Sequence, residues 1–179
     1  VKQAVHLALG RPRFPDYLRC EKELAKLINS SPRPVRAYWL FAYNCPPDRE
    51  LLGLLGGGRH EIGVHFVRSP ERELRALEAA VGMKLRWYSV HGVRGPLMAL
   101  LWRRVRRPRV DGGRLGLRPV PSHLSLDWWA RRLPPEDVVR MAESLPDGSF
   151  ISLHAIWLFR RGLDRGPAYP ALRRLLWLS

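Results

Sequence analysis

The chain has 179 residues, of which 46% are hydrophobic and seven are tryptophan, so it is long enough to bury a core as one domain. It contains no run of about 20 uncharged apolar residues, which excludes a membrane-spanning helix. The first residues lack the apolar core of a signal peptide, and we therefore expect a cytoplasmic protein. The formal net charge is +15, and all but four of the 31 basic residues are arginine. This favours anionic partners, unless the arginines reflect genome composition or a hot habitat.

Strand and helix patterns alternate along the first half of the chain. Apolar and aromatic runs predict buried strands, and leucines at helical spacing predict helices. The expected strands are 4–9, 35–43, 60–67 and 84–90, and the expected helices are 16–28, 48–55, 70–81 and 96–104. The helix at 70–81 has the clearest boundaries, with Ser69 as N-cap, Pro70 in the first turn and Gly82 as C-cap.

The second half continues the alternation with weaker signals. We expect strands at 114–120, 123–127 and 150–154, helices at 134–144 and 168–178, and an exposed basic loop at 103–109. Alternation without hairpins predicts a parallel sheet with right-handed crossovers, and a repeat of about 25 residues is typical of a βα barrel. We therefore expect residues 1–179 to form a single βα-repeat domain, an α/β fold. The predicted architecture is a small, slightly incomplete (β/α) barrel of about seven parallel strands, and the alternative is an open doubly wound α/β sheet.

Histidine and aspartate recur where the predicted strands end. His65 lies on the third strand, His91 ends the fourth, His154 ends the last, and Asp127 closes a weaker one. In a barrel, residues at these positions meet at one rim. Imidazole and carboxylate groups bind divalent metals, and a bound metal activates water. The pattern indicates a polar or metal site with zinc or a similar divalent metal as candidate cofactor, although a lone histidine is more often a core residue bonded to a backbone carbonyl.

Three of these positions carry a resemblance to a known family. The string Gly-Arg-His-Glu-Ile-Gly-Val-His at 58–65 resembles the second motif of the polysaccharide deacetylase (NodB-like) family, whose last histidine binds a divalent metal. Leu-Asp-Trp at 126–128 resembles the fourth motif, and Phe-Ile-Ser-Leu-His at 150–154 resembles the fifth, whose histidine is the family's general acid. The resemblance covers about residues 36–160 and implies a barrel hydrolase.

The chain departs from the family pattern at two places. The first predicted strand is followed by Gly10, where the family has adjacent aspartates that serve as base and metal ligand. Ser69 stands where the family has its second metal histidine. The resemblance therefore leaves the general base unassigned, and another set of ligands would have to replace the usual metal site.

Together these observations favour a divergent polysaccharide-deacetylase-like hydrolase, which cleaves an amide (N-acyl) C–N bond of a small molecule or glycan with a metal-bound or polarised water. The candidate residues are His154 and Asp127 for catalysis, His65 and His91 for metal, and Arg68, Arg94 and Trp128 for ligand binding. One alternative is a non-catalytic barrel that binds an anionic ligand through rim arginines. Another is a nucleic-acid-binding protein using the arginines of 103–118, which the lack of interleaved aromatic residues disfavours.

Overall fold

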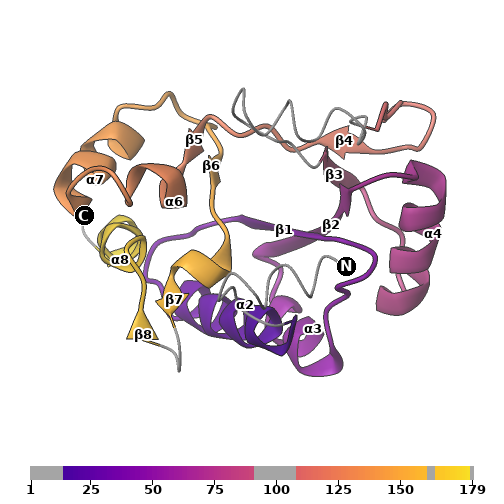
Figure 1. Cartoon of the computed structure of the whole chain (residues 1–179), viewed down its shortest axis with the longest axis horizontal. Helices are drawn as coiled ribbons and strands as arrows, with labels where there is room; N and C mark the ends of the chain where they lie inside the picture. Colours follow the sequence, from indigo (N-terminus) through magenta and orange to yellow (C-terminus); the bar gives the residue numbers. More distant parts are fainter. Residues whose placement is uncertain (1–13, 91–107, 161–163, 178–179) are drawn as a thin grey trace, which may run out of the picture. The chain divides into compact units, whose positions relative to one another are not determined.

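The structure, a computed structural model, describes residues 14–90, 108–160 and 164–177 (Figure 1). The predicted strand at 4–9 and the predicted helix at 96–104 lie outside these residues. The chain divides into two compact units, each described here by itself. Unit 1 comprises Val1–Val35, Arg49–Leu55 and Ser122–Ser179, and unit 2 comprises Arg36–Asp48 and Gly56–Pro121. None of the helices in the described ranges is long and apolar enough to cross a membrane.

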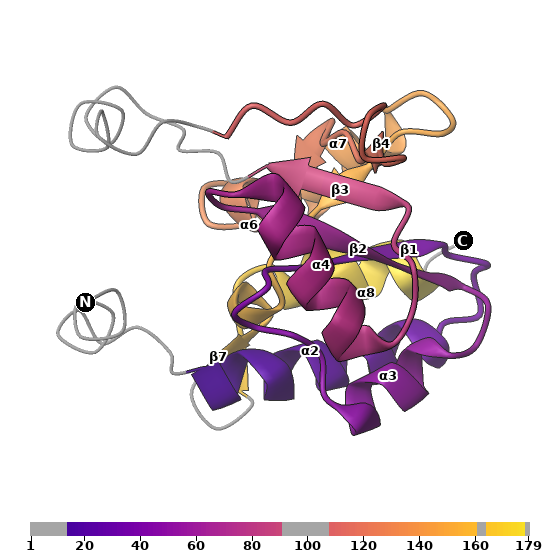
Figure 2. The ribbon, with the colours of Figure 1, turned by 90° about the vertical axis from the view of Figure 1, so that its right-hand side faces the viewer.

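Unit 2 is built on a four-stranded parallel sheet. Its strands, in the order in which they are hydrogen bonded, are β1 (Ala37–Phe41), β2 (His60–Phe66), β3 (Trp87–Val90) and β4 (Arg118–Pro119). Helix α4 (Pro70–Val81) connects β2 to β3 and packs against β2, burying Leu74 and Leu77 (Figure 2). Val64 and Phe66 of β2 are fully buried, as expected for a parallel strand covered by a helix.

The strands of this sheet are neighbours in space in the same order as in the sequence. A doubly wound sheet reverses its strand order at a switch point, and the four described strands contain no such reversal. Because all neighbouring strands of this sheet are parallel, the prediction of a parallel α/β fold is confirmed. The described parallel strands form one sheet of four and one of two, and they do not show a barrel of about seven strands.

Helix α4 begins and ends where the sequence predicts, but a different side chain caps its start. Ser69 occupies the N-cap position without a capping hydrogen bond from its side chain. Instead, the buried Glu73 carboxylate accepts hydrogen bonds from the backbone N–H groups of Val67, Arg68 and Ser69, at 2.7, 2.8 and 3.1 Å. One carboxylate satisfies three donors here, which a serine hydroxyl cannot do. Gly82 ends the helix in the left-handed conformation, with φ 71°.

Unit 1 combines helices with short strands. Its helices are α2 (Phe14–Asn29), α3 (Arg49–Leu55), α6 (Leu126–Trp129), α7 (Pro135–Glu143), α8 (Tyr169–Trp177) and the 3₁₀ helix η1 (Ala155–Trp157). Its strands are the parallel pair β5 (Leu124–Ser125) and β6 (Ile151–Ser152), and the antiparallel pair β7 (Phe159–Arg160) and β8 (Asp164–Arg165).

Helix α2 organises the core of this unit. It packs against α3 and η1 (Figure 1) and buries a stripe of side chains at helical spacing, which are Cys20, Leu24, Ala25 and Ile28. The Cys20 thiol donates a long hydrogen bond to the carbonyl oxygen of Phe159, 3.9 Å away. These contacts fix α2 against the segment that follows β6.

Two predicted strands of unit 1 are shorter than the sequence suggests, and one hairpin is not predicted at all. The strand expected at 123–127 ends at Ser125, because a helical turn buries Leu126 and Asp127 directly after it. The strand expected at 150–154 ends at Ser152, and a 3₁₀ turn follows His154. The β7–β8 hairpin contradicts the expectation of an alternation without hairpins. Short apolar runs do not distinguish strands from single helical turns.

Candidate active site

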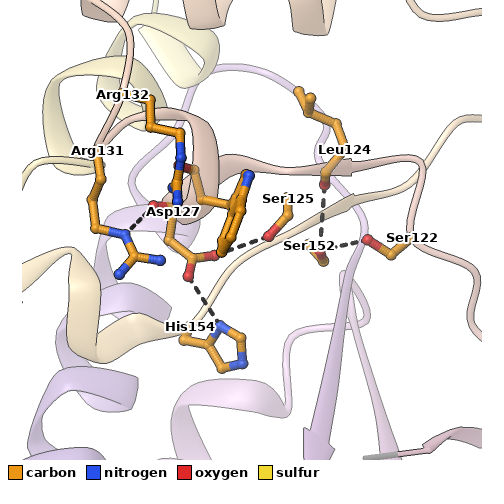
Figure 3. A network of polar contacts seen from close by, with 9 residues as sticks. Ser122, Leu124, Ser125, Asp127, Arg131, Arg132, Ser152 and His154 are labelled. Carbon is orange, nitrogen blue, oxygen red and sulfur yellow. Dashed lines mark hydrogen bonds and ion pairs between the residues drawn. The ribbon is translucent and has the colours of Figure 1, made fainter. Parts of the chain in front are cut away.

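The parallel pairing of β5 and β6 brings two predicted residues together. Ser125 pairs with Ser152 in the register of these strands. Asp127 and His154 each follow two residues later, so both emerge at the same end of the pair. Serine side chains support this register, because the hydroxyls of Ser122 and Ser152 lie 2.6 Å apart (Figure 3). The expected meeting of Asp127 and His154 beyond their strands is thus observed within unit 1.

The two side chains form a hydrogen-bonded pair of very unequal exposure. Nδ1 of His154 lies 3.2 Å from Oδ2 of Asp127, and the side chains are 71% and 5% exposed, respectively. The Ser125 hydroxyl donates a hydrogen bond to the other carboxylate oxygen, at 3.5 Å. Figure 3 shows the imidazole with Nδ1 toward Asp127 and its second nitrogen turned away. A buried carboxylate thus orients a histidine whose Nε2 is directed away from it.

The surroundings of His154 favour its protonated form. The hydrogen bond to Asp127 is the main cause that raises the pKa of His154 above its ordinary value, and the negative charges of Asp127 and Glu21 act in the same direction. Partial desolvation of the ring by its neighbours, although the side chain is largely exposed, and the positive charge of Arg131 oppose them and lower this pKa. The net shift is upward, so a larger fraction of the imidazole carries a proton near neutral pH than in an isolated histidine.

Glu21 is a titratable neighbour of this pair that the sequence analysis missed. Burial raises its pKa from 4.5 to about 7, and the charge of His154 opposes this rise. Glu21 lies on α2, three residues before the buried Leu24 and seven before the buried Ile28. A carboxyl group on the apolar side of a helix was the available signal, because such a group is usually expected on the solvent side. It can exchange a proton in the physiological range.

Two arginines that follow α6 contact tryptophans of α6 and η1. Nε of Arg131 donates to the backbone carbonyl of Asp127 at 2.9 Å, and Nη1 of Arg132 donates to that of Trp128 at 2.8 Å. The guanidinium carbon of Arg131 lies 4.5 Å from the ring centre of Trp157, and that of Arg132 lies 3.5 Å from that of Trp128. Trp128, a predicted ligand-binding residue, is 43% exposed. The sequence analysis did not identify the other three.

His65 lies in unit 2 and has a different partner. It is the sixth residue of β2, opposite Ser89 of β3, and its Nδ1 lies 2.7 Å from the Ser89 hydroxyl. Arg68, just beyond β2, is exposed. His91 and Arg94 lie outside the described residues. The structure therefore brings Asp127 and His154 together, while the expected convergence of all four histidine and aspartate residues on one rim stays a prediction.

Two other residues of the 58–65 string have structural explanations. A Cβ atom on Gly63 would lie 2.5 Å from the carbonyl oxygen of Trp87 and 2.7 Å from a side-chain carbon of Leu40, so the close approach of β2 and β3 requires glycine. His60 accepts a hydrogen bond from the indole of Trp39 at 3.0 Å. Burial, and secondarily the charge of Arg59, lowers the pKa of His60, which favours this neutral, accepting form.

The described part of the chain does not offer a complete metal site. Among residues 14–90, 108–160 and 164–177, no three side chains of His, Cys, Asp or Glu are placed to hold one ion. His65 faces a serine hydroxyl, and Asp127 faces a histidine and another serine. These groups do not fit the three-ligand arrangement of a catalytic zinc site. The described site holds two titratable groups, His154 and Glu21, and a carboxylate, Asp127, that orients the imidazole.

Comparisons with known proteins do not assign a family or a function to this site. No protein-family model matches the chain, and searches of curated proteins and of solved structures found no significant match.

Proposed function

We propose that this protein is a divergent polysaccharide-deacetylase-like hydrolase that cleaves an amide (N-acyl) C–N bond, with His154 as general acid. The observation that carries the proposal is the hydrogen bond of 3.2 Å between exposed His154 and buried Asp127. It joins two residues whose surrounding sequences resemble the family's fourth and fifth motifs. The same proposal includes the predicted fold, a small, slightly incomplete (β/α) barrel of about seven parallel strands, and the sequential strand order of the sheet in unit 2 supports it.

The proposed reaction requires a proton donor at the leaving nitrogen. Water adds to the amide carbon, and the C–N bond breaks as Nε2 of protonated His154 donates its proton to the departing amine. Asp127 is a positioning residue, because it holds Nδ1–H and stabilises the imidazolium. Glu21 is the proposed acceptor of the proton that the attacking water loses, because its charge acts on His154 within the same unit and its pKa is raised to about 7. The products are a carboxylic acid and an amine.

An assay of amide hydrolysis tests this proposal. Purified protein is incubated with N-acetylated sugars and short N-acetylated oligosaccharides, with and without added zinc, and released acetate and free amine are quantified. We expect His154→Gln to lower the rate by about a hundredfold or more, as for a lost general acid. His123→Gln is the matched control, because Nδ1 of His123 accepts a hydrogen bond from the backbone of Phe150, a structural contact within the same unit.

The pH dependence tests the role of Asp127. A general acid must be protonated, so activity should fall as pH rises through the pKa of His154, which lies above its ordinary value of 6.5. Asp127→Asn removes the largest cause of that upward shift, and we expect the alkaline limb to move to lower pH. An unchanged profile in a folded Asp127→Asn protein, or full activity of His154→Gln, would refute the assignment.

The proposed metal ligands need a separate experiment. The assignment of a divalent metal to His65 and His91 is tested by elemental analysis after native purification. Near-stoichiometric zinc, cobalt or nickel that is lost in His65→Ala would support it. Metal content unchanged by His65→Ala would contradict it.

Nucleic-acid binding is the weaker alternative. Most of the basic loop at 103–109 lies outside the described residues, and Arg109 is exposed. If the loop binds nucleic acid, affinity should fall steeply with salt, because released counterions contribute most of the binding free energy. We expect no detectable binding at low salt.

A further inference from the structure

Arg131 and Arg132 are held in place without a carboxylate partner. Their hydrogen bonds go to the backbone carbonyls of Asp127 and Trp128, and within the described ranges neither guanidinium group forms an ion pair with a carboxylate. Both side chains are exposed. A guanidinium group has five N–H donors, and each of these hydrogen bonds uses one of them. The other donors of each arginine point away from these carbonyls. Within the described ranges, both positive charges therefore lie outside any ion pair with an acidic side chain.

Aromatic rings fix the orientation of these two groups. The guanidinium carbon of Arg131 lies 4.5 Å from the ring centre of Trp157 and 5.9 Å from that of Trp128. Arg132 stacks at 3.5 Å on Trp128. Both tryptophans are partly exposed, at 43% for Trp128 and 40% for Trp157. A stacked arginine has already lost much of its side-chain freedom, so a ligand that it binds incurs a smaller entropic cost.

Arg131 also lies close to the proposed general acid. Nε of Arg131 is bonded to the backbone carbonyl of Asp127, whose carboxylate orients His154 (Figure 3). The charge of Arg131 acts on His154, lowering its pKa. A group bound to Arg131 would therefore be close enough to change the electrostatic environment of the imidazole.

We propose that Arg131 and Arg132 bind a carboxylate or phosphate group of the substrate beside His154. The substrate of the hydrolase would then be an anionic N-acyl compound, such as an acylated sugar bearing a carboxylate or phosphate. Arginine suits both anions because its planar fork matches two of their oxygens. The identity of the substrate rests on the proposed function, whereas anion binding itself does not require catalysis.

Binding is tested with inorganic phosphate and with acetate as probes on the full chain. Imidazole resonances of isotopically labelled protein report the pKa of His154, and tryptophan fluorescence reports binding at the rings. The groups that act on His154 are Asp127 from α6, Glu21 from α2 and Arg131. An anion that neutralises Arg131 weakens the effect that lowers this pKa, so the pKa of His154 should rise on saturation. The probe with the larger response identifies the preferred anion.

Matched variants separate anion binding from a purely structural role. Arg131→Gln/Arg132→Gln should weaken phosphate binding about tenfold or more and abolish the anion-induced rise of the His154 pKa. Arg173→Gln, a control at an exposed position of α8, should leave both unchanged. If neither probe perturbs His154, or if the double variant responds as the wild type does, the anion site is refuted.

The outcomes also separate this inference from the proposed function. If His154→Gln loses hydrolysis while no anion binds at the arginines, the hydrolase stands and the anion site fails. If phosphate raises the pKa of His154 but no N-acyl compound is cleaved, the anion site stands and the hydrolase fails. If both hold, the double variant should raise KM for a phosphorylated or carboxylated N-acyl sugar about tenfold, with little change for the neutral sugar.

Discussion

The two units each place a histidine near the carboxyl end of a parallel strand, but they give it different partners. In unit 2, His65 of β2 is partly buried, and its Nδ1 lies 2.7 Å from the neutral hydroxyl of Ser89. In unit 1, His154 follows β6 with a side chain 71% exposed, and its Nδ1 lies 3.2 Å from the carboxylate of Asp127. Only the second arrangement joins an accessible imidazole to a buried negative charge.

The comparison shows that a position near a strand end does not by itself fix the hydrogen-bond partner or the exposure of a histidine. A hydroxyl can donate or accept a hydrogen bond, so Ser89 can orient either tautomer of His65. An ionised carboxylate only accepts hydrogen bonds, so Asp127 fixes Nδ1 of His154 as the donor and stabilises the charged ring. His154 therefore fits the proposed role of general acid, whereas the contact of His65 with Ser89 links β2 to β3. The following changes test this distinction, beginning with the largest expected effect.

Replacing each histidine by glutamine compares the two directly. We expect His154→Gln to reduce hydrolysis by about a hundredfold or more, because the proton donor is lost. In the absence of a bound metal, His65→Gln should change the rate less than about threefold, since glutamine can still bond to Ser89. Initial rates on the same N-acyl substrate measure both effects. Equal losses in two folded variants would remove the distinction between the units.

Replacing one glycine in each unit tests how closely other atoms approach the backbone at that position. Gly63→Ala should destabilise the protein by about 1–3 kcal/mol, because its Cβ atom would overlap the backbone of β3. Gly53 of α3 in unit 1 is the control, because a Cβ atom there meets nothing within 4 Å. Gly53→Ala should stabilise the helix by about 0.5–1 kcal/mol. Urea unfolding measures both changes, and a Gly63→Ala protein as stable as the wild type would contradict the predicted overlap.

Glu21 gives unit 1 a specific dependence of stability on pH. Folding raises its pKa from 4.5 to about 7, so the folded state binds this proton more tightly. The free energy of unfolding should therefore fall as pH rises from 4.5 to about 7 and then level off. Glu21→Gln should remove about 1–2 kcal/mol of that fall, as measured by urea unfolding at pH 5 and pH 8.

A second variant separates this effect from that of His154. The pKa of His154 is also raised, so its contribution to stability is present below its ordinary pKa and is lost as pH rises through its folded value. This loss of stability should persist in Glu21→Gln, with a changed size because the charge of Glu21 no longer acts on His154. It should disappear in His154→Gln. If Glu21→Gln keeps the whole pH dependence of the wild type, Glu21 does not titrate near neutral pH.

Local sequence patterns were sufficient to predict most elements of the fold. Leucines at helical spacing predicted α4, and Pro70 and Gly82 marked its two ends, because proline suits the first helical turn and glycine adopts a positive φ without steric cost. The apolar run of β2 between glycines and a Ser-Pro pair likewise identified a strand. Such signals concern neighbours in sequence, and they did not predict the short elements β7, β8 and η1.

The site was predictable only in part. Asp127 and His154 were identified from strand ends and motif resemblance, but their contact depends on the register of β5 and β6, which pairs residues 27 positions apart. Glu21 lies on a helix more than a hundred residues earlier in the sequence, and its raised pKa comes from burial in the folded unit. Sequence by itself determined the elements and the residues at their ends. Only the tertiary structure decided which charges meet and which are desolvated, because pairing and burial depend on contacts between distant segments.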